Sequence, residues 1–252
     1  MTSSTAPWPN AGYGPIINDT SGQATTIQQI GGAGIARWKQ LCYGAHLQGA
    51  WNTVEHVTLL PGASIGEHVH DRTEEIYYIL SGRAEMRMNA EVHQVRAGDL
   101  ITTPIGARHA IENSGDDDMV FYVTEVFPGT EPPKAPRFLT MAESLESVAG
   151  FRDSPAPVLV SGARLTDTFT GPWRAFHEIR LAGSQRLGHY TLPDVAEVVF
   201  VVSGDAAVTV EGTTYSGSVG LCVALPVGAR RSIENLSASD ELRLISTEVL
   251  AA

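Results

Sequence analysis

The chain repeats itself at a spacing of about 122 residues, and this repeat limits the possible folds more than any other feature. Residues 104–113 match residues 226–235 at seven of ten positions. The same spacing takes Glu75 to Glu197. Agreement in one register at well-separated points is typical of a duplicated module. We therefore predict two copies of one fold along the 252 residues.

Upstream of these points the spacing shifts to 121 residues. His68 then matches His189, and His56 matches His177. This shift predicts one inserted residue in the second copy, ahead of Glu197. Because His56 recurs as His177, we expect this pair to serve the fold rather than the chemistry.

Each copy is predicted to be β-structure, because its apolar or alternating segments are short and bounded by Gly, Pro, Asn or Asp. The predicted strands are residues 54–60, 75–80, 84–88, 100–103 and 120–127 in the first copy, and 176–181, 198–202, 206–210 and 221–225 in the second. Capping-box spacing from Thr140 to Glu143 predicts one short helix at 141–148 in the linker. We predict an all-β fold in two domains, residues 1–130 with an N-terminal arm and residues 131–252 with the linker. The arm is expected to pack across the two domains or against a dimer partner.

The charge balance excludes several classes of partner. Seventeen basic and 28 acidic side chains give a net charge of -11. Nucleic acids and anionic membrane surfaces bind basic patches, so neither is expected as a partner. No run approaches the 18 apolar residues of a membrane span, and the N-terminus lacks the regions of a signal peptide. Cys42 and Cys222 form no disulfide framework, and the apolar run around Cys222 predicts a buried thiol. We expect a cytoplasmic protein that binds a small molecule.

Three histidines and one glutamate have the spacing of a metal site. His68 and His70 are two residues apart, so on a strand they leave the same face. Glu75 begins the next strand, and His109 follows after two turns. Three imidazoles and one carboxylate suit Fe, Mn, Ni, Cu, Co or Zn better than Ca or Mg.

These residues lie in two segments that resemble the two motifs of the cupin family. The segments are Gly62-x5-His68-x-His70-x4-Glu75-x6-Gly82 and Gly98-x5-Pro104-x-Gly106-x2-His109-x3-Asn113. Together with the repeat, they identify the chain as similar to a bicupin, with two tandem jelly-roll (double-stranded β-helix) barrels. The resemblance implies one divalent transition metal per chain, held by His68, His70, Glu75 and His109. The resemblance is also compatible with a homodimer.

Two residues next to these ligands could also take part in the site. Glu74 competes with Glu75 as a ligand, but the repeat aligns Glu75 with Glu197 and Glu74 with Ala196, which favours Glu75. Strand parity places Tyr77 on the face of Glu75, where its hydroxyl could contact a substrate or its ring could serve the core.

The second copy departs from the motif. Thr191 replaces the second histidine and Arg231 replaces the last, while His189 and Glu197 are retained. Arginine has no lone pair to offer a metal. We therefore predict that the Arg231 guanidinium occupies the place of the metal and pairs with Glu197. The second barrel is expected to be a scaffold and dimerisation half.

The predicted function is that of a metal-dependent enzyme acting on a small organic molecule. Catalytic roles are assigned to Glu75 and Tyr77. Dioxygenase or other oxidoreductase chemistry is placed ahead of non-redox isomerase, cyclase or lyase chemistry. A non-catalytic metabolite-binding protein is the alternative from another class. The fold does not choose among these.

Overall fold

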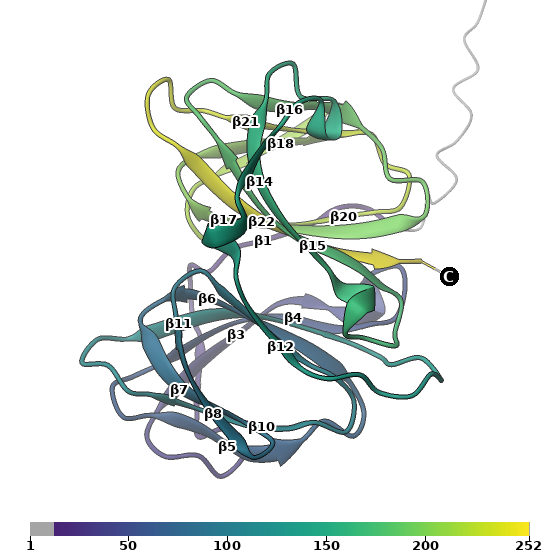
Figure 1. The fold of residues 1–252 in the computed structure, drawn as a ribbon. Coiled ribbons are helices and arrows are strands. Elements are labelled where there is room, and N and C mark those ends of the chain that lie inside the picture. The colour runs from purple at the N-terminus through teal and green to yellow at the C-terminus, as the bar shows by residue number, and fades with distance from the viewer. Residues whose placement is uncertain (1–12, 252) are drawn as a thin grey trace, which may run out of the picture.

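The structure, a computed structural model, describes residues 13–251 and confirms an all-β chain folded as two stacked units (Figure 1). Each unit is a seven-stranded sheet closed against a four-stranded sheet. The elements of the first half are β1 (Ile16–Asn18), β2 (Thr25–Ile27), β3 (Ala36–Tyr43), the 3-10 turn η1 (Gly44–His46), β4 (Trp51–Leu59), β5 (Ser64–Val69), β6 (Glu74–Ser81), β7 (Arg83–Met88), β8 (Glu91–Arg96), β9 (Asp99–Thr103), β10 (Arg108–Asn113) and β11 (Met119–Val126). Those of the second half are β12 (Arg137–Thr140), η2 (Met141–Ser144), β13 (Glu146–Val148), η3 (Phe151–Asp153), β14 (Val158–Arg164), η4 (Leu165–Asp167), β15 (Trp173–Leu181), β16 (Arg186–Tyr190), β17 (Val195–Ser203), β18 (Ala206–Val210), β19 (Thr213–Gly217), β20 (Cys222–Leu225), β21 (Arg231–Asn235) and β22 (Leu242–Leu250).

Strand alternation gives each large sheet two apolar faces. In β6, for example, Tyr77 and Ile79 pack inside the first barrel, while Ile76 and Tyr78 point the other way. The outer faces of the two large sheets pack against each other and form one buried cluster between the barrels. Both large sheets are therefore buried on both sides, and their strands read as nearly continuous apolar runs.

The two cysteines meet in this interface. Cys42 and Cys222 are buried, and their Sγ atoms lie 4.0 Å apart. This confirms that Cys222 acts as a small buried residue within the fold.

The two halves exchange their first strands. β1 pairs with β20 of the second barrel, and β12 pairs with β9 of the first, in sheets with the same strand order. The arm thus packs across the two barrels, one of the two expected arrangements. Just after β1, Thr20 lies against Gly220, whose positive φ of 90° and lack of a side chain allow the close approach. Because strands on both sides of residue 130 cross to the other barrel, the domain boundary there stays a prediction.

The predicted helix at 141–148 is wrong. Residues 13–251 contain no α-helix, and this segment is the 3-10 turn η2 followed by strand β13. Thr140 makes no capping bond, because it ends β12 opposite Asp99 and its hydroxyl donates to Asp99 Oδ1 at 2.7 Å. β13 forms a ladder with β14 instead of continuing a helix.

The inserted residue predicted in the second copy is also absent. Tyr190 pairs with Arg231 as His68 pairs with His109, so the spacing is 122 here too. Leu192 O accepts a hydrogen bond from Gly228 N, as His70 O does from Gly106 N. Tyr190 and Leu192, rather than His189 and Thr191, therefore stand where the first barrel has His68 and His70. His189 is exposed.

Candidate metal centre

Neighbouring strands bring the four predicted ligands to one point inside the first barrel. His68 lies on β5, His70 follows its end, Glu75 lies on β6 and His109 lies on β10. The Nε2 atom of His109 is 3.1 Å from Nε2 of His68 and 3.1 Å from Nε2 of His70. These three histidines form a triad that could hold a metal ion, although their role as ligands stays a proposal.

The hydrogen bonds behind the triad fix which nitrogen carries the proton. His68 Nδ1 lies 2.9 Å from Gly66 O, and His70 Nδ1 lies 3.2 Å from Thr73 O. A carbonyl oxygen only accepts, so each Nδ1 must donate. In the neutral ring, each Nε2 then directs a lone pair into the barrel, as in a metal-ligating histidine.

The carboxylate of Glu75 completes the donor set. Its Oε2 is buried without a hydrogen-bond donor and lies 3.3 Å from Nε2 of both His70 and His109. A buried carboxylate oxygen that faces the Nε2 lone pair of His70 is unfavourable unless a cation lies between them. The residues therefore fit a divalent metal ion.

Burial governs the protonation of this site. Burial, and then the charges of His70 and His68, hold the pKa of His109 well below its ordinary value, which keeps that ring neutral. Burial raises the pKa of Glu75 to about 7. Burial also lowers the pKa of His68. For His70, burial is outweighed by the nearby charge of Glu75, and its pKa is raised.

Two further carboxylates face the same interior, and sequence reasoning missed them. Glu125 on β11 lies directly opposite Glu75, and Glu55 lies on β4, the strand on the other side of β11. Burial raises the pKa of Glu55 to about 7. We call Glu55, Glu125 and Glu75 the acidic row. The alternation of Glu55 with the inward-facing Val57 and Leu59 was the signal that could have revealed it.

Tyr77 stands beside the triad, as strand parity predicted. Its ring centroid is 5.2 Å from that of His109 and 4.7 Å from that of Phe121. Burial, and then the charge of Glu75, raises its pKa well above the ordinary value, so the phenol stays protonated. Its contact with a substrate stays a prediction.

Glu74 points out of the barrel and binds the second half of the chain. Its carboxylate accepts hydrogen bonds from Thr170 N and Oγ1, both at 2.8 Å, from Gly171 N at 2.9 Å and from Trp173 Nε1 at 3.1 Å. Glu74 therefore joins the two halves and takes no part in the donor set.

Alanine substitutions should separate the two glutamates. We expect Glu74→Ala to lower the free energy of unfolding by about 3 kcal/mol, because one buried and three partly buried donors lose a charged acceptor, and to keep bound metal. Glu75→Ala should lose metal and keep most of its stability. Denaturant unfolding and metal analysis of both variants test this, and the reverse pattern would make Glu74 the ligand.

The corresponding point of the second barrel holds arginines. Arg231 is fully buried, and its Nη1 lies 3.1 Å from Glu197 Oε2, which confirms the predicted pair. Arg152, from η3, was not anticipated: its Nη1 lies 2.6 Å from Glu197 Oε1 and its Nη2 lies 2.6 Å from Glu248 Oε1. Tyr190 also donates to Glu197, at 3.1 Å. Two guanidinium groups thus neutralise two carboxylates in this barrel.

His56 and His177 are not equivalent, contrary to the alignment. Thr124 pairs with Val54 and Thr247 pairs with Phe176, so His177 corresponds to Glu55 and faces the second barrel. His56 lies between the barrels, stacked on Phe200.

The burial of His177 predicts a loss of stability in acid. Burial, and then the charge of Arg152, lowers its pKa from about 6.5 to about 3. Below pH 6.5 the unfolded chain binds a proton that the folded chain refuses, so the free energy of unfolding falls as the pH drops toward 3. Between pH 7.5 and 5.0 the loss should be about 2 kcal/mol for this residue. Urea unfolding at both pH values should show a drop smaller by that amount in His177→Gln, with the exposed His46→Gln unchanged from wild type.

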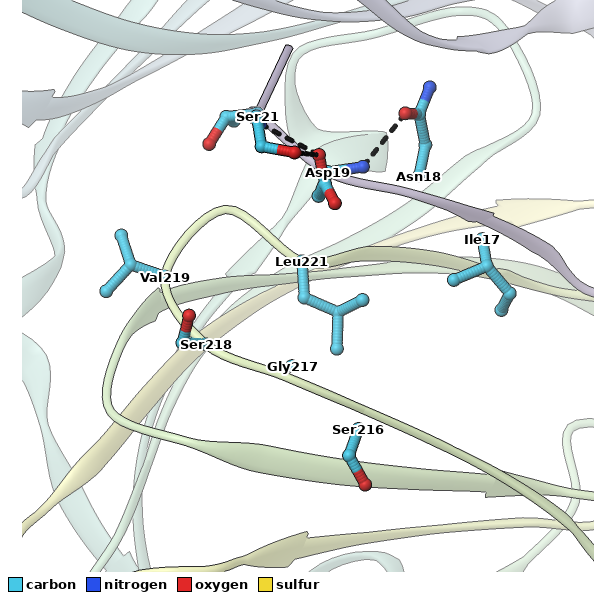
Figure 2. A pocket seen from close by; sticks show the side chains of 10 residues that line it. Ile17, Asn18, Asp19, Ser21, Ser216, Gly217, Ser218, Val219 and Leu221 are labelled. Atoms are coloured by element: carbon cyan, nitrogen blue, oxygen red, sulfur yellow. Dashed lines mark hydrogen bonds between the residues drawn. The ribbon is translucent and has the colours of Figure 1, made fainter.

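A hollow on the surface of the second barrel has different chemistry. It lies where the residues after β1 cross the loop between β19 and β20, and Figure 2 shows Asp19 above Leu221 and Val219. Asp19 Oδ1 already accepts bonds from Ser21 N and Oγ, at 2.8 and 2.5 Å. No metal-ligating cluster lines it, so the triad is the stronger candidate among the described residues.

Comparisons with known proteins agree with this site. The cupin domain family matches residues 55–125, which hold all four predicted ligands. The oxalate-binding protein of Thermotoga maritima is 34% identical over 111 residues, which are 44% of this chain and 92% of that protein. The chain belongs to the cupin superfamily. A 5-nitrosalicylic acid 1,2-dioxygenase of Bradyrhizobium is 32% identical over 63 residues, and this cupin spans only 30% of its length.

Solved structures show the same two-barrel fold. Oxalate decarboxylase of Bacillus subtilis superposes with a TM-score of 0.70 at 17% identity, over 94% of this cupin and 78% of that chain. Another structure of the decarboxylase is described by its Mn(II) centres. At this identity the likeness shows the bicupin fold alone. In the part of the chain that the structure describes, no helix is long and apolar enough to cross a membrane.

Proposed function

We propose that this cupin is a metal-dependent enzyme that oxidises a small organic molecule inside its first barrel. The observation that carries the proposal is the convergence of three Nε2 atoms and one buried carboxylate oxygen. Nε2 of His109 lies 3.1 Å from Nε2 of His68 and of His70, and Glu75 Oε2 lies 3.3 Å from Nε2 of His70 and of His109. His68, His70, His109 and Glu75 would hold the ion. A bound transition metal would supply Lewis acidity and, for a redox ion, a place for substrate and dioxygen together.

The nitrogen spacing supports an ion with more than four ligands. Two nitrogens about 2.1 Å from one ion lie about 3.0 Å apart at a right angle and about 3.4 Å apart at a tetrahedral angle. The spacing of 3.1 Å on both sides of His109 fits the right angle. This spacing is compatible with Mn, Fe, Co or Ni, which accept more than four ligands.

The chain's own residues prepare the site. The carbonyls of Gly66 and Thr73 accept from Nδ1 of His68 and His70, which orients both rings and leaves Nε2 of each neutral ring free to bind the ion. The protonated Tyr77 hydroxyl can donate to an oxygen of the substrate. Apolar side chains such as Met86, Met88 and Phe121 line the barrel and exclude water.

Oxygen uptake by protein loaded with defined metals tests the proposal. Fe(II)-, Mn(II)- and Zn(II)-loaded samples would be given catechol, salicylate and a 1,3-diketone in an oxygen electrode, beside His70→Ala. Uptake with Fe or Mn that is absent in the variant supports oxidation. Turnover without oxygen in the Zn sample would instead favour an isomerase, cyclase or lyase. Metal-dependent binding without turnover would favour a metabolite-binding cupin, the reading suggested by the name of the Thermotoga relative.

A further inference from the structure

The acidic row is a concentration of negative charge on one sheet face. Glu125 lies directly opposite Glu75 across the β11–β6 ladder. Across the β11–β4 ladder, Glu125 lies opposite Thr53, two residues from Glu55. Directly opposed side chains have Cβ atoms about 5 Å apart, and like charges in this position repel. Positive charge in front of this face would therefore stabilise the ionised acidic row.

The first barrel provides no cationic side chain for this purpose. Among residues 13–126 every arginine is exposed, and Arg137 on β12, which is partly buried, pairs with Asp167 at 3.6 Å. Lys39 is partly buried, but it lies opposite His56 on the outer face of the sheet and pairs with Asp19 at 3.8 Å. The neutral donors Asn52 and Thr73 bind Glu125 Oε2, at 2.6 and 3.1 Å, and leave the charge in place.

The second barrel meets the same requirement with guanidinium groups. Glu197 and Glu248 stand at the positions of Glu75 and Glu125. Arg231 and Arg152 neutralise them at 3.1 and 2.6 Å. At the third position, the neutral ring of His177 replaces Glu55. The exposed Arg174 also lies 3.5 Å from Glu248 Oε2, so two carboxylates in that barrel meet three guanidinium groups.

When all three carboxyls of the acidic row are ionised, a divalent ion balances only two of the three negative charges. We propose that the substrate bound beside the metal carries a positively charged amino group, which lies against Glu55 and Glu125, and that dicarboxylates such as oxalate are rejected. This inference rests on the proposed function, because it assumes the ion held by the triad. It separates this cupin from a protein that binds oxalate, which carries two negative charges.

Three hydroxamates of matched size test the inference. β-Alanine hydroxamate, butanehydroxamate and succinate monohydroxamate share one metal-binding group and end in an ammonium, a methyl and a carboxylate. Calorimetry on the full-length metal-loaded chain, with metal content measured on each sample, gives the three dissociation constants. We expect the ammonium probe to bind about tenfold more tightly than the neutral one, and the carboxylate probe about tenfold more weakly, since one unit charge is worth about that ratio.

Isosteric variants test whether the acidic row causes the preference for the ammonium probe. Glu55→Gln and Glu125→Gln should each reduce the ammonium preference several-fold, with unchanged metal content and unchanged affinity for butanehydroxamate. The exposed Glu112→Gln on β10 is the control and should behave as wild type. Equal binding of the three probes to metal-loaded wild type, or tighter binding of the carboxylate probe, would overturn the inference.

A failure of the proposed function can be distinguished from a failure of this inference. If the chain bound no metal, butanehydroxamate would not bind, and metal analysis would show it. The row would then be tested in the metal-free protein, where Glu55→Gln should raise the midpoint of thermal unfolding by removing a repelling charge. A midpoint at or below that of wild type would overturn the inference by itself.

Discussion

His109→Ala is expected to reduce bound metal from about one ion per chain to below about 0.1. His109 is central to the triad, with its Nε2 3.1 Å from each of the other two. Losing even a residue that only orients a ligand typically costs about 10–100-fold in metal affinity, and losing the ligand should cost at least as much. Metal analysis of protein purified without added metal measures the result.

Two further variants give this experiment its controls. His93→Ala changes a histidine on β8, outside the site, and should keep its metal. Thr103→Val removes the hydroxyl 3.0 Å from His109 Nδ1 and should weaken metal binding about 10–100-fold without abolishing it. Full metal content in His109→Ala would refute the site. About two ions per chain in wild type would show that the second barrel also binds metal.

Arg231→Met should lower the free energy of unfolding by about 3–5 kcal/mol, because it leaves the buried carboxylate of Glu197 without one of its two cations. The Arg231 side chain is fully buried, and its Nε and Nη2 also donate to Ala229 O and Pro226 O, at 3.0 and 3.1 Å. Metal content should not change, because the triad lies in the other barrel.

Two further variants test whether the unpaired charge of Glu197 causes this loss of stability. Arg230→Met changes the exposed neighbour and should alter stability by less than about 0.5 kcal/mol. Adding Glu197→Gln to Arg231→Met should restore part of the loss, since the unpaired charge is then gone. Denaturant unfolding of the four proteins measures these differences. A loss below about 1 kcal/mol in Arg231→Met would mean that Arg152 alone neutralises Glu197.

Much of the fold and the triad could be predicted because they depend on periodic or repeated features. The repeat predicted two units, and its alignment of Glu75 with Glu197 and of Glu74 with Ala196 correctly chose Glu75, inside the barrel, over Glu74, outside it. The register of the second copy could not be read correctly. His189 and Thr191 imitate the His68-x-His70 spacing at an offset of 121, whereas the ladder between β16 and β21 aligns Tyr190 with His68.

The remaining errors concern residues whose environment is set by distant parts of the chain. Thr140 has a local helix-start pattern, but its pairing with Asp99, 41 residues earlier, makes it the end of a strand. Arg152 enters the second barrel from a turn in which its backbone is left-handed, with φ 47° and ψ 49°. Neither periodicity nor spacing marks such a residue.

The exchange of first strands bears on how a chain of this kind arises. The Thermotoga relative is little longer than the 111 residues it shares with this cupin, so it is about one repeat long. A one-repeat ancestor of this design has no second half to receive its first strand, so only another copy of itself could do so. Gene duplication and fusion would then join two subunits into one polypeptide. In a homodimer every mutation appears in both subunits, whereas the fused gene lets each half change alone. One half could thus keep its histidines while the other acquired the arginines that now fill its barrel.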